Sequence, residues 1–298
     1  MELLEVKSMK FLIVDAFTET LFGGNPAGVV ILDEGMDFPS DETMVKTAAE
    51  LRYSETAFIK RLNEKEFNIR YFTPAAEVDL CGHATIASFV SLLHKGLIAD
   101  NSTYVNHTLA GDLEINVKDG FVMMEMGTPV KINQIEDPAK IDELYHIMGV
   151  EYDPSVGLIP QMISTGLPDI MMPVKTQAEL EKIAPDFPAL SKLSEAYEVV
   201  GVHAFTLDAE DGVTAHTRNF APLYDIDEEA ATGTSNGALT YYFYLNDIIG
   251  SEAECKIIQG EKMDRPSAIL TSLKAEGDDC KIKVGGTGVV LAEGDINL

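Results

Sequence analysis

Cysteine is scarce in this sequence, and the shortage limits the chemistry of the protein. The three thiols, Cys81, Cys255 and Cys280, stand far apart among 298 residues. They are too few for a disulfide framework, and no C-x-x-C pair is present for zinc or redox work. A reducing compartment is expected, and we predict a cytoplasmic protein.

Basic residues are also few. The chain has 22 Lys and Arg against 49 Asp and Glu, a formal net charge of −27. This excess repels phosphate backbones and anionic lipid headgroups, so neither nucleic acid nor a membrane surface is an expected partner. Because the acidic residues are dispersed and form no tail, they indicate a solubilising surface and name no function.

Long apolar runs are missing as well. No stretch approaches the roughly 18 apolar residues of a membrane helix. The N-terminal sequence MELLEVKSMKFLIVDAF lacks an uninterrupted apolar segment followed by a small-residue cleavage site, so no secretion signal is predicted. Patterned sequence begins at Lys10, which makes Met9 a candidate start beside Met1.

The patterning that is present predicts a globular α+β protein of two domains or one large domain. Hydrophobic residues make up 46% of the chain and charged residues 24%, which are ordinary globular values. The first part of the chain is expected to hold strands at 11–17, 25–32, 55–59 and from 68, helices at 40–51 and 84–96, and a β-hairpin within 103–126 that turns at Asp119-Gly120.

The second part of the chain repeats the first. Residues 203–207 resemble 56–60, residues 213–222 resemble 67–74, and residues 231–250 resemble 80–98. Three matches in the same order favour an internal duplication. We therefore expect two similar halves, residues 1–127 and 128–287, with the last strand, at about 288–298, returning to the first half. A ligand site is expected where such halves face one another.

Each half carries a glycine turn directly before an apolar helix, at Gly82 and at Gly233. Backbone amides at a helix N-terminus are unpaired donors at the positive end of the helix dipole, and glycine lets a ligand approach them. Two such turns are suited to a carboxylate or oxyanion without any metal. The alternative, that they are ordinary helix starts, stays open.

Three side chains are candidates for acid–base work. Glu55 precedes an apolar strand, where a carboxylate is expected to be partly buried with a raised pKa. His83, beside Gly82, can shuttle a proton near neutral pH. Glu229 stands with Glu228 ahead of the second glycine turn, where the first half offers only Asp79. A solvated strand-end Glu, a capping His and a solvated acidic loop are the ordinary alternatives.

Other chemistries have less support. The six histidines form no H-x-H or H-E-x-x-H spacing, so no metal site is predicted. Neither a phosphate-binding G-x-x-x-x-G-K-[ST] nor a hydrolase G-x-S-x-G is present. Cys81 is a candidate nucleophile or carbon base if the helix end lowers its pKa, although a buried structural cysteine is the commoner case.

Several long motifs resemble the PhzF family of phenazine-biosynthesis-like isomerases. They are VDAFT and GNPAGVV within 14–30, SETAF at 54–58, FTPAAEVDLCGHAT at 72–85, STGLPD at 164–169, ATG at 231–233, QGEKMDRPS at 259–267 and the VGGTG run. The resemblance covers essentially the whole chain. It implies the diaminopimelate-epimerase-like fold, with two pseudo-symmetric α+β halves, each a mostly antiparallel sheet wrapped around a central helix, and the site between them.

The resemblance also implies chemistry. The phenazine member of the family that the chain resembles moves a proton across a dihydro-hydroxyanthranilate ring, with a Glu that corresponds to Glu55 as base and acid. Gly82 and His83 correspond to the family's Gly-His pair. The family is free of cofactor and metal and usually dimeric, so we expect no cofactor and a homodimer.

One family block departs from its pattern. The usual E-D-P-A-T-G-S reads E-E-A-A-T-G-T here, so Glu229 replaces an Asp and Thr234 a Ser. The longer acid is expected to change substrate size or the partner of Glu55. The two-thiol racemases of the same fold need a second cysteine where this chain has Thr232, which disfavours their mechanism.

These observations predict a cofactor-independent isomerase that moves a proton on a small carboxylate-bearing metabolite. Glu55, His83 and Glu229 are the expected catalytic residues, and Gly82, Gly233 and Thr234 the expected substrate-binding residues. Two alternatives stay open: a non-catalytic protein that binds a small acid or a partner, and an epimerase that depends on Cys81.

Overall fold

The computed structural model describes residues 8–277 and 279–298, which form two compact units. The first unit comprises the described residues up to Met124 together with Gly285–Leu298, and the second comprises Glu125–Val284. The sequence analysis places these divisions at 127 and 287. Its predictions about a start and a leader fall partly on residues 1–7, which lie outside the described residues.

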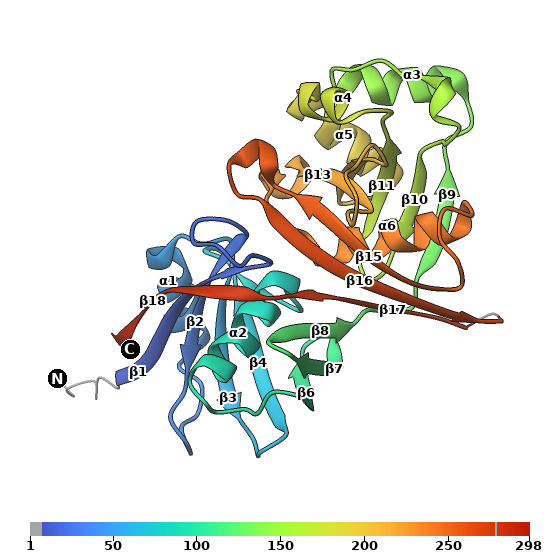
Figure 1. Ribbon diagram of the computed structural model, residues 1–298. Coiled ribbons are helices and arrows are strands. Elements are labelled where there is room, and N and C mark those ends of the chain that lie inside the picture. Colours follow the sequence, from blue (N-terminus) through green and yellow to red (C-terminus); the bar gives the residue numbers. More distant parts are fainter. Residues whose placement is uncertain (1–7, 278) are drawn as a thin grey trace. The chain divides into compact units, whose positions relative to one another are not determined.

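The first unit is a mixed, mostly antiparallel sheet with two helices (Figure 1). Its strands pair in the order β18-β1-β2-β3-β4-β6-β7-β8, with β2–β3 and β4–β6 parallel and the other described pairs antiparallel. The elements are β1 (Ser8–Ala16), β2 (Asn25–Ile31), α1 (Asp41–Leu51), β3 (Thr56–Arg61), β4 (Glu66–Phe72), β5 (Glu77–Val78), α2 (Gly82–His94), β6 (Ser102–Thr108), β7 (Gly111–Lys118), β8 (Phe121–Glu125) and β18 (Gly288–Asn297).

The second unit repeats this topology. The run β10-β11-β12-β13-β15-β16 matches β1-β2-β3-β4-β6-β7 in order and direction, with β11–β12 and β13–β15 parallel. The elements are β9 (Val130–Gln134), α3 (Pro138–Ile147), η1 (Pro154–Val156), β10 (Gln161–Ser164), β11 (Pro168–Pro173), α4 (Gln177–Lys182), α5 (Phe187–Tyr197), β12 (Gly201–Thr206), β13 (Ala215–Ala221), η2 (Pro222–Tyr224), β14 (Ile226–Glu229), α6 (Gly233–Leu245), β15 (Glu252–Gln259), η3 (Glu261–Met263), β16 (Ser267–Glu276) and β17 (Asp279–Gly286). The predicted α+β fold of two similar halves is confirmed.

A largely buried helix packs against the sheet of each unit, α2 on β1, β2 and β3, and α6 on β10, β11 and β16 (Figure 1). In the first unit the rings of Phe67, Phe89 and Tyr104 join α2 to the strands, with centroids 5.7–6.1 Å apart. In the second unit Tyr242 and Phe243 of α6 pack on Phe205 of β12. The amphipathic helices α1, α3 and α5 cover other apolar surfaces. Because α2 and α6 are buried on most sides, apolar and small residues are spread around each of them, and this pattern predicts a buried helix.

Local signals in the sequence produce the expected element boundaries. The Ser40 side chain accepts a hydrogen bond from the Thr43 N–H and starts α1, as expected of an N-cap. Asp119 and Gly120, with φ of 53° and 78°, form the tight turn between β7 and β8, and Gly adopts this conformation without strain. In the part of the chain that the structure describes, no helix is long and apolar enough to cross a membrane.

Candidate active site

Glu55 is held between a helix end and a strand start in the first unit. Helix α1 ends at Leu51, and Arg52 adopts a left-handed conformation that turns the chain. The Glu55 carbonyl then accepts a hydrogen bond from the Gly28 N–H at 3.3 Å, and β3 begins at Thr56 alongside β2. The backbone on both sides of Glu55 is thereby fixed, so its side chain has a defined direction.

A chain of buried hydrogen bonds fixes the backbone at Cys81, the residue before α2. Thr85 donates its hydroxyl proton to the Cys81 carbonyl at 2.7 Å. Because that proton is used, the Tyr71 hydroxyl, 2.7 Å from the Thr85 Oγ1, must be the donor between them. The Asn106 amide donates to the Tyr71 oxygen in turn. This support positions the first turn of α2, where His83 lies.

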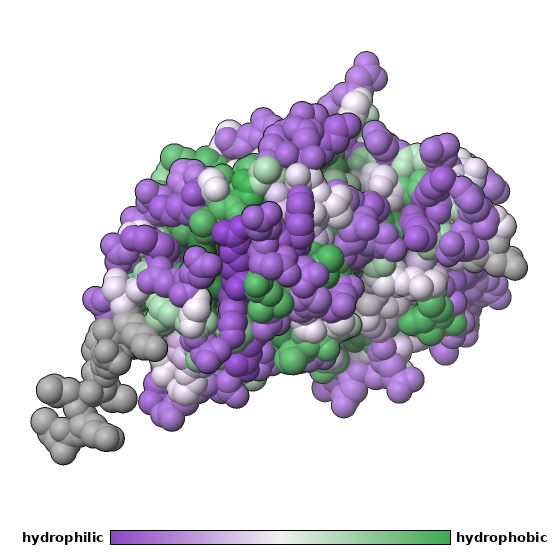
Figure 2. Space-filling model, turned by 90° about the horizontal axis from the view of Figure 1, so that it is seen from below, coloured by the Kyte–Doolittle hydropathy of each residue, from purple (hydrophilic) through white to green (hydrophobic). Residues whose placement is uncertain are grey.

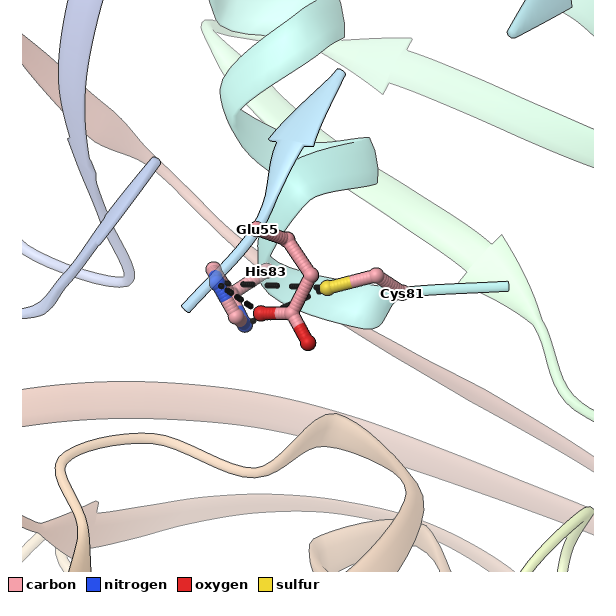
Figure 3. Close-up of side chains that lie close together, drawn as sticks. All are labelled: Glu55, Cys81 and His83. Carbon is pink, nitrogen blue, oxygen red and sulfur yellow. Dashed lines mark hydrogen bonds and ion pairs between the residues drawn. The ribbon is translucent and has the colours of Figure 1, made fainter. Parts of the chain in front are cut away.

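Glu55, Cys81 and His83 form one cluster (Figure 3). The Glu55 Oε2 lies 3.2 Å from the His83 Nε2, and the Cys81 Sγ lies 3.4 Å from Nδ1 and 3.9 Å from Nε2. The other carboxylate oxygen points away from the imidazole ring (Figure 3). The His83 and Glu55 side chains are only 4% and 16% exposed, so this ion pair is largely shielded from water.

Asn25 and Ser54, which contact the two ring nitrogens of His83, determine which nitrogen carries the proton. The Asn25 amide is 3.2 Å from Nδ1, and the Ser54 hydroxyl is 3.3 Å from Nε2. A neutral ring accepts from the Asn25 Nδ2 and keeps its proton on Nε2, whereas a charged ring needs the Asn25 oxygen at Nδ1. In both cases Nε2 carries a proton beside Glu55.

The ionisation of Glu55 differs from the sequence-based expectation. Burial raises the pKa of the Glu55 carboxyl, but the proton and charge of His83, with hydrogen bonds from Ser54 and Cys81, outweigh it and hold the pKa below its ordinary value. The raised pKa predicted from the apolar strand is therefore wrong. The reason is that the sequence does not reveal the cation that lies 3.2 Å away.

The same surroundings raise the pKa of both His83 and Cys81. Burial lowers the pKa of His83, but the Cys81 sulfur and the Glu55 carboxylate raise it well above its ordinary value. Burial and the Glu55 charge raise the pKa of the Cys81 thiol to about 11, so it stays protonated near neutral pH. We therefore attribute the proton on His83 to the Glu55 carboxylate. The helix end does not activate Cys81, contrary to the condition set for its role as a base.

The other predicted residues lie in the second unit, at the corresponding helix. Thr232, the residue before α6, donates its hydroxyl proton to the Glu229 Oε2 at 2.7 Å and does not cap its helix through its side chain. Cys81, the residue before α2, makes no side-chain cap either. The Thr234 carbonyl accepts from the Thr165 hydroxyl, which anchors the turn at Gly233. Thr232 occupies the position of Cys81, as the family resemblance implies.

Gln259 organises this turn, and the sequence analysis assigned it no role. Its amide nitrogen donates to the Glu229 carbonyl and the Thr232 hydroxyl, at 2.7 and 3.1 Å. Its oxygen accepts from the Thr232 N–H and the Asn236 amide. All four capacities of a buried amide are thus satisfied. The QGEKMDRPS motif pointed to this residue but could not show what it contacts.

Glu228 has a structural role. Arg218 binds it through two hydrogen bonds of 2.8 Å, and Arg70 binds Glu77 in the same manner in the first unit. The first-half counterpart of Glu228 is therefore Glu77, so the prediction that this half offers only Asp79 is wrong. Of the acidic pair, Glu229 alone remains a candidate for the site.

These geometries can be compared with known proteins. The family model described as phenazine biosynthesis-like protein, PhzC-PhzF, matches residues 14–294. The chain belongs to this family. An uncharacterized isomerase of Clostridium acetobutylicum is 31% identical over 300 residues, covering 96% of this chain and 97% of its own. A human phenazine biosynthesis-like domain-containing protein is 32% identical over 304 residues, covering 95% and 97%.

Solved structures agree with this family. A PhzF-family phenazine biosynthesis protein of Bacillus anthracis superposes with a TM-score of 0.85 and 27% identity, covering 97% of this chain and 99% of its own. A hydroxyproline epimerase of Agrobacterium vitis has a TM-score of 0.62 at 13% identity, covering 99% and 93%, and so shares the fold. The chain is an isomerase of the PhzF type, and these comparisons name no substrate for it.

Proposed function

We propose that this protein moves a proton on a small carboxylate-bearing metabolite without a cofactor, with Glu55 as both base and acid. The observation that carries the proposal is the largely buried Glu55–His83 ion pair, in which the carboxylate oxygen Oε2 lies 3.2 Å from the His83 Nε2. A shielded pair of titratable groups with perturbed pKa values is typical of a functional site. A carboxylate that stays ionised beside a proton donor is suited to take a proton from carbon.

The reaction is a balanced transfer within one substrate. Glu55 removes a proton from one carbon, the electron pair moves along the conjugated or carboxylate-stabilised system, and protonated Glu55 returns the proton to another carbon. His83 holds its proton toward Glu55 and so maintains the ionised carboxylate between turnovers. The backbone N–H groups after Gly82, at the positive end of α2, are suited to the negative charge that develops.

The remaining predicted residues keep separate roles in this proposal. Glu229, held by Thr232, is assigned as the second carboxylate, and the turn at Gly233 and Thr234 as a second anion-binding helix start. Each is tested by its own variant, Glu229→Gln and Thr234→Val. The cytoplasmic location and the homodimer stay predictions.

Deuterium incorporation tests the proposal. The protein is incubated in heavy water with a panel of small amino acids and cyclohexadiene carboxylic acids, and exchange is followed by NMR. We expect exchange at one carbon of one class, with Glu55→Gln lowering its rate by about 10²–10⁴-fold. Glu50→Gln, which removes an exposed carboxyl from α1, is the matched control.

The two alternatives make different predictions in the same assay. Exchange that survives in Glu55→Gln but disappears in Cys81→Ser would replace Glu55 with a Cys81-dependent epimerase. Tight binding of a small acid without any deuterium exchange would support a binding protein. Glu55→Gln would then change only the affinity for that acid. Circular dichroism of each variant separates these outcomes from loss of folding.

A further inference from the structure

The cluster of Glu55, Cys81 and His83 has the donor set of a zinc site. Each residue offers one ligand atom, and all three atoms lie within 4.8 Å of one another. Among the described residues this is the one group of His, Cys, Asp and Glu that meets that limit. Thiolate, imidazole and carboxylate together suit Zn²⁺, whereas Mg²⁺ and Ca²⁺ prefer oxygen ligands alone.

Two of the three distances between ligand atoms are close to those around a tetrahedral zinc ion, and the third, between the Glu55 oxygen and the Cys81 sulfur, is within 4.8 Å. Typical bond lengths to zinc give edges of about 3.4 Å between nitrogen and carboxylate oxygen and about 3.6 Å between nitrogen and sulfur. The His83 Nε2 lies 3.2 Å from the Glu55 Oε2 and 3.9 Å from the Cys81 Sγ. Shifts of about 0.3 Å would close the difference, as ligands usually relax when an ion enters.

The surroundings of His83 also suit metal binding. Zinc-bound imidazole generally uses its second ring nitrogen for a hydrogen bond that holds its orientation. With Nε2 on the ion, Nδ1 carries the ring proton, so Asn25, whose amide nitrogen lies 3.2 Å from Nδ1, has to turn its amide over and accept that proton through its oxygen. His216 and His107 each contact two carboxylates, but through opposite ring nitrogens, so one ion cannot be held by all three groups at either place.

We propose that Glu55, Cys81 and His83 bind one Zn²⁺ ion reversibly, with the fourth position open, and that this ion inhibits the enzyme. Ligation removes the proton of the Cys81 thiol and the proton on the His83 Nε2, both of which pass to solvent, and takes the Glu55 Oε2 as the third ligand. The carboxylate can then no longer accept a proton from substrate. The binding site stands on geometry alone, whereas the inhibition rests on the proposed function.

Cobalt spectroscopy tests the binding site without any substrate. Co²⁺ added to the purified full chain is expected to produce a near-ultraviolet charge-transfer band from a thiolate–cobalt bond, and one equivalent of Zn²⁺ should remove it. Cys81→Ser should abolish the band and weaken zinc binding, measured by chelator competition, by at least about tenfold. Glu55→Gln and His83→Gln should weaken binding without abolishing the thiolate band.

The controls separate this cluster from other ligands. Cys280→Ser removes a partly exposed thiol and should leave the band and the zinc affinity unchanged. His107→Gln removes an exposed histidine beside Glu66 and Asp112 and should also have no effect. A band that persists in Cys81→Ser, or no band and no bound zinc in the wild type, would overturn the proposal.

Inhibition is measured separately, with the exchange assay. One equivalent of Zn²⁺ should abolish deuterium exchange in the wild type, and a chelator should restore it. If zinc binds through Cys81 but exchange continues, the proposed inhibition is wrong while the metal site stands, and Glu55→Gln alone decides whether Glu55 is the base. If exchange depends on Glu55 but no zinc binds, the proposed function stands and the metal site does not.

Discussion

Glu55 and His83 determine each other's charge because they lie 3.2 Å apart in a largely buried place. Burial alone would favour the neutral form of both groups. The mutual attraction and hydrogen bonding are stronger here, so the pKa of Glu55 is lowered and that of His83 is raised. The resting site is therefore an ion pair over a wide range of pH, and this has a kinetic consequence.

We expect the rate of deuterium exchange to be nearly constant between pH 4.5 and 6.5, the ordinary pKa values of Glu and His. The lowered pKa keeps Glu55 ionised below that window, and the raised pKa keeps His83 protonated above it. In His83→Gln the acidic limb should move to higher pH, because only the hydrogen bonds from Ser54 and Cys81 then oppose the rise in the pKa of Glu55 that burial causes. A pH–rate profile measures this.

The control for the pH profile is His94→Gln, which removes an exposed histidine from the other end of α2. It should leave both limbs in place. An acidic limb at the same pH in His83→Gln and the wild type would show that His83 does not set the charge of Glu55.

Asp169 is a second buried carboxyl, remote from this pair in the sequence. Burial raises its pKa to about 6, although hydrogen bonds from the Ser235 hydroxyl, at 2.5 Å, and from the Gly201 backbone N–H act in the opposite direction. Because the folded pKa lies above the ordinary 3.8, its stabilising contribution is present below pH 3.8 and is lost as the pH rises through about 6. Ionised Asp169 therefore destabilises the protein at neutral pH.

Asp169→Asn should raise the free energy of unfolding at pH 8 by on the order of 1–3 kcal/mol, since Asn removes the buried charge in nearly the same volume. The gain should shrink at pH 4, where the wild-type carboxyl is protonated. Urea denaturation at both values measures it. Asp142→Asn, an exposed carboxyl of α3, should change stability at neither pH; an equal effect of both substitutions would contradict the argument.

At the scale of elements, the duplication is visible in a repeated ion pair. In the first unit Arg70 of β4 binds Glu77 of β5, and its guanidinium carbon lies 5.1 Å from the ring centroid of Phe72. In the second unit Arg218 of β13 binds Glu228 of β14, and its guanidinium carbon lies 4.9 Å from the ring centroid of Phe220. The two pairs differ in burial. The Arg218 side chain is 8% exposed and also donates to two carbonyls at the end of α4, whereas that of Arg70 is 21% exposed.

Arg218→Met should therefore lower the free energy of unfolding by about 3–5 kcal/mol, because Glu228 is left as a buried charge without its partner. Arg70→Met should cost less, since water reaches Arg70 and Glu77 and screens the loss. Guanidinium denaturation measures both. Adding Glu228→Leu to Arg218→Met should recover part of the loss, and equal losses in the two units would contradict this ranking.

For the whole molecule, the net charge of −27 is the dominant electrostatic feature. Hydrophilic residues cover most of the face seen in Figure 2, and hydrophobic residues form separate patches on it. Like charges at this density repel one another in the folded chain and oppose compaction. At 0.1 M salt, repulsion between exposed charges more than about 10 Å apart is largely screened.

Adding sodium chloride should therefore raise the midpoint of thermal unfolding, most steeply at low concentration where screening changes fastest. Choline chloride should act similarly, because the effect needs no specific cation. A midpoint that falls with salt would mean that the surface ion pairs outweigh the net repulsion.

Much of this protein was predictable from its sequence. Hydrophobic periodicity, the Ser40 cap and the Asp119-Gly120 turn are local signals, and the helices and strands that they predict are present. The repeated motifs showed the two similar halves, and the family motifs pointed to Glu55 and His83. Each of these signals lies within a few neighbouring residues, so no knowledge of distant contacts is needed to interpret it.

Only the tertiary structure decided what these residues do to one another. The lowered pKa of Glu55, the use of Glu228 by Arg218, the four hydrogen bonds of Gln259 and the three-residue donor cluster all join positions distant in sequence. No metal-ligand spacing appears in the sequence because the cluster's ligands come from a strand start and a helix start. Ionisation and ligation depend on distances through space, and folding alone sets those distances.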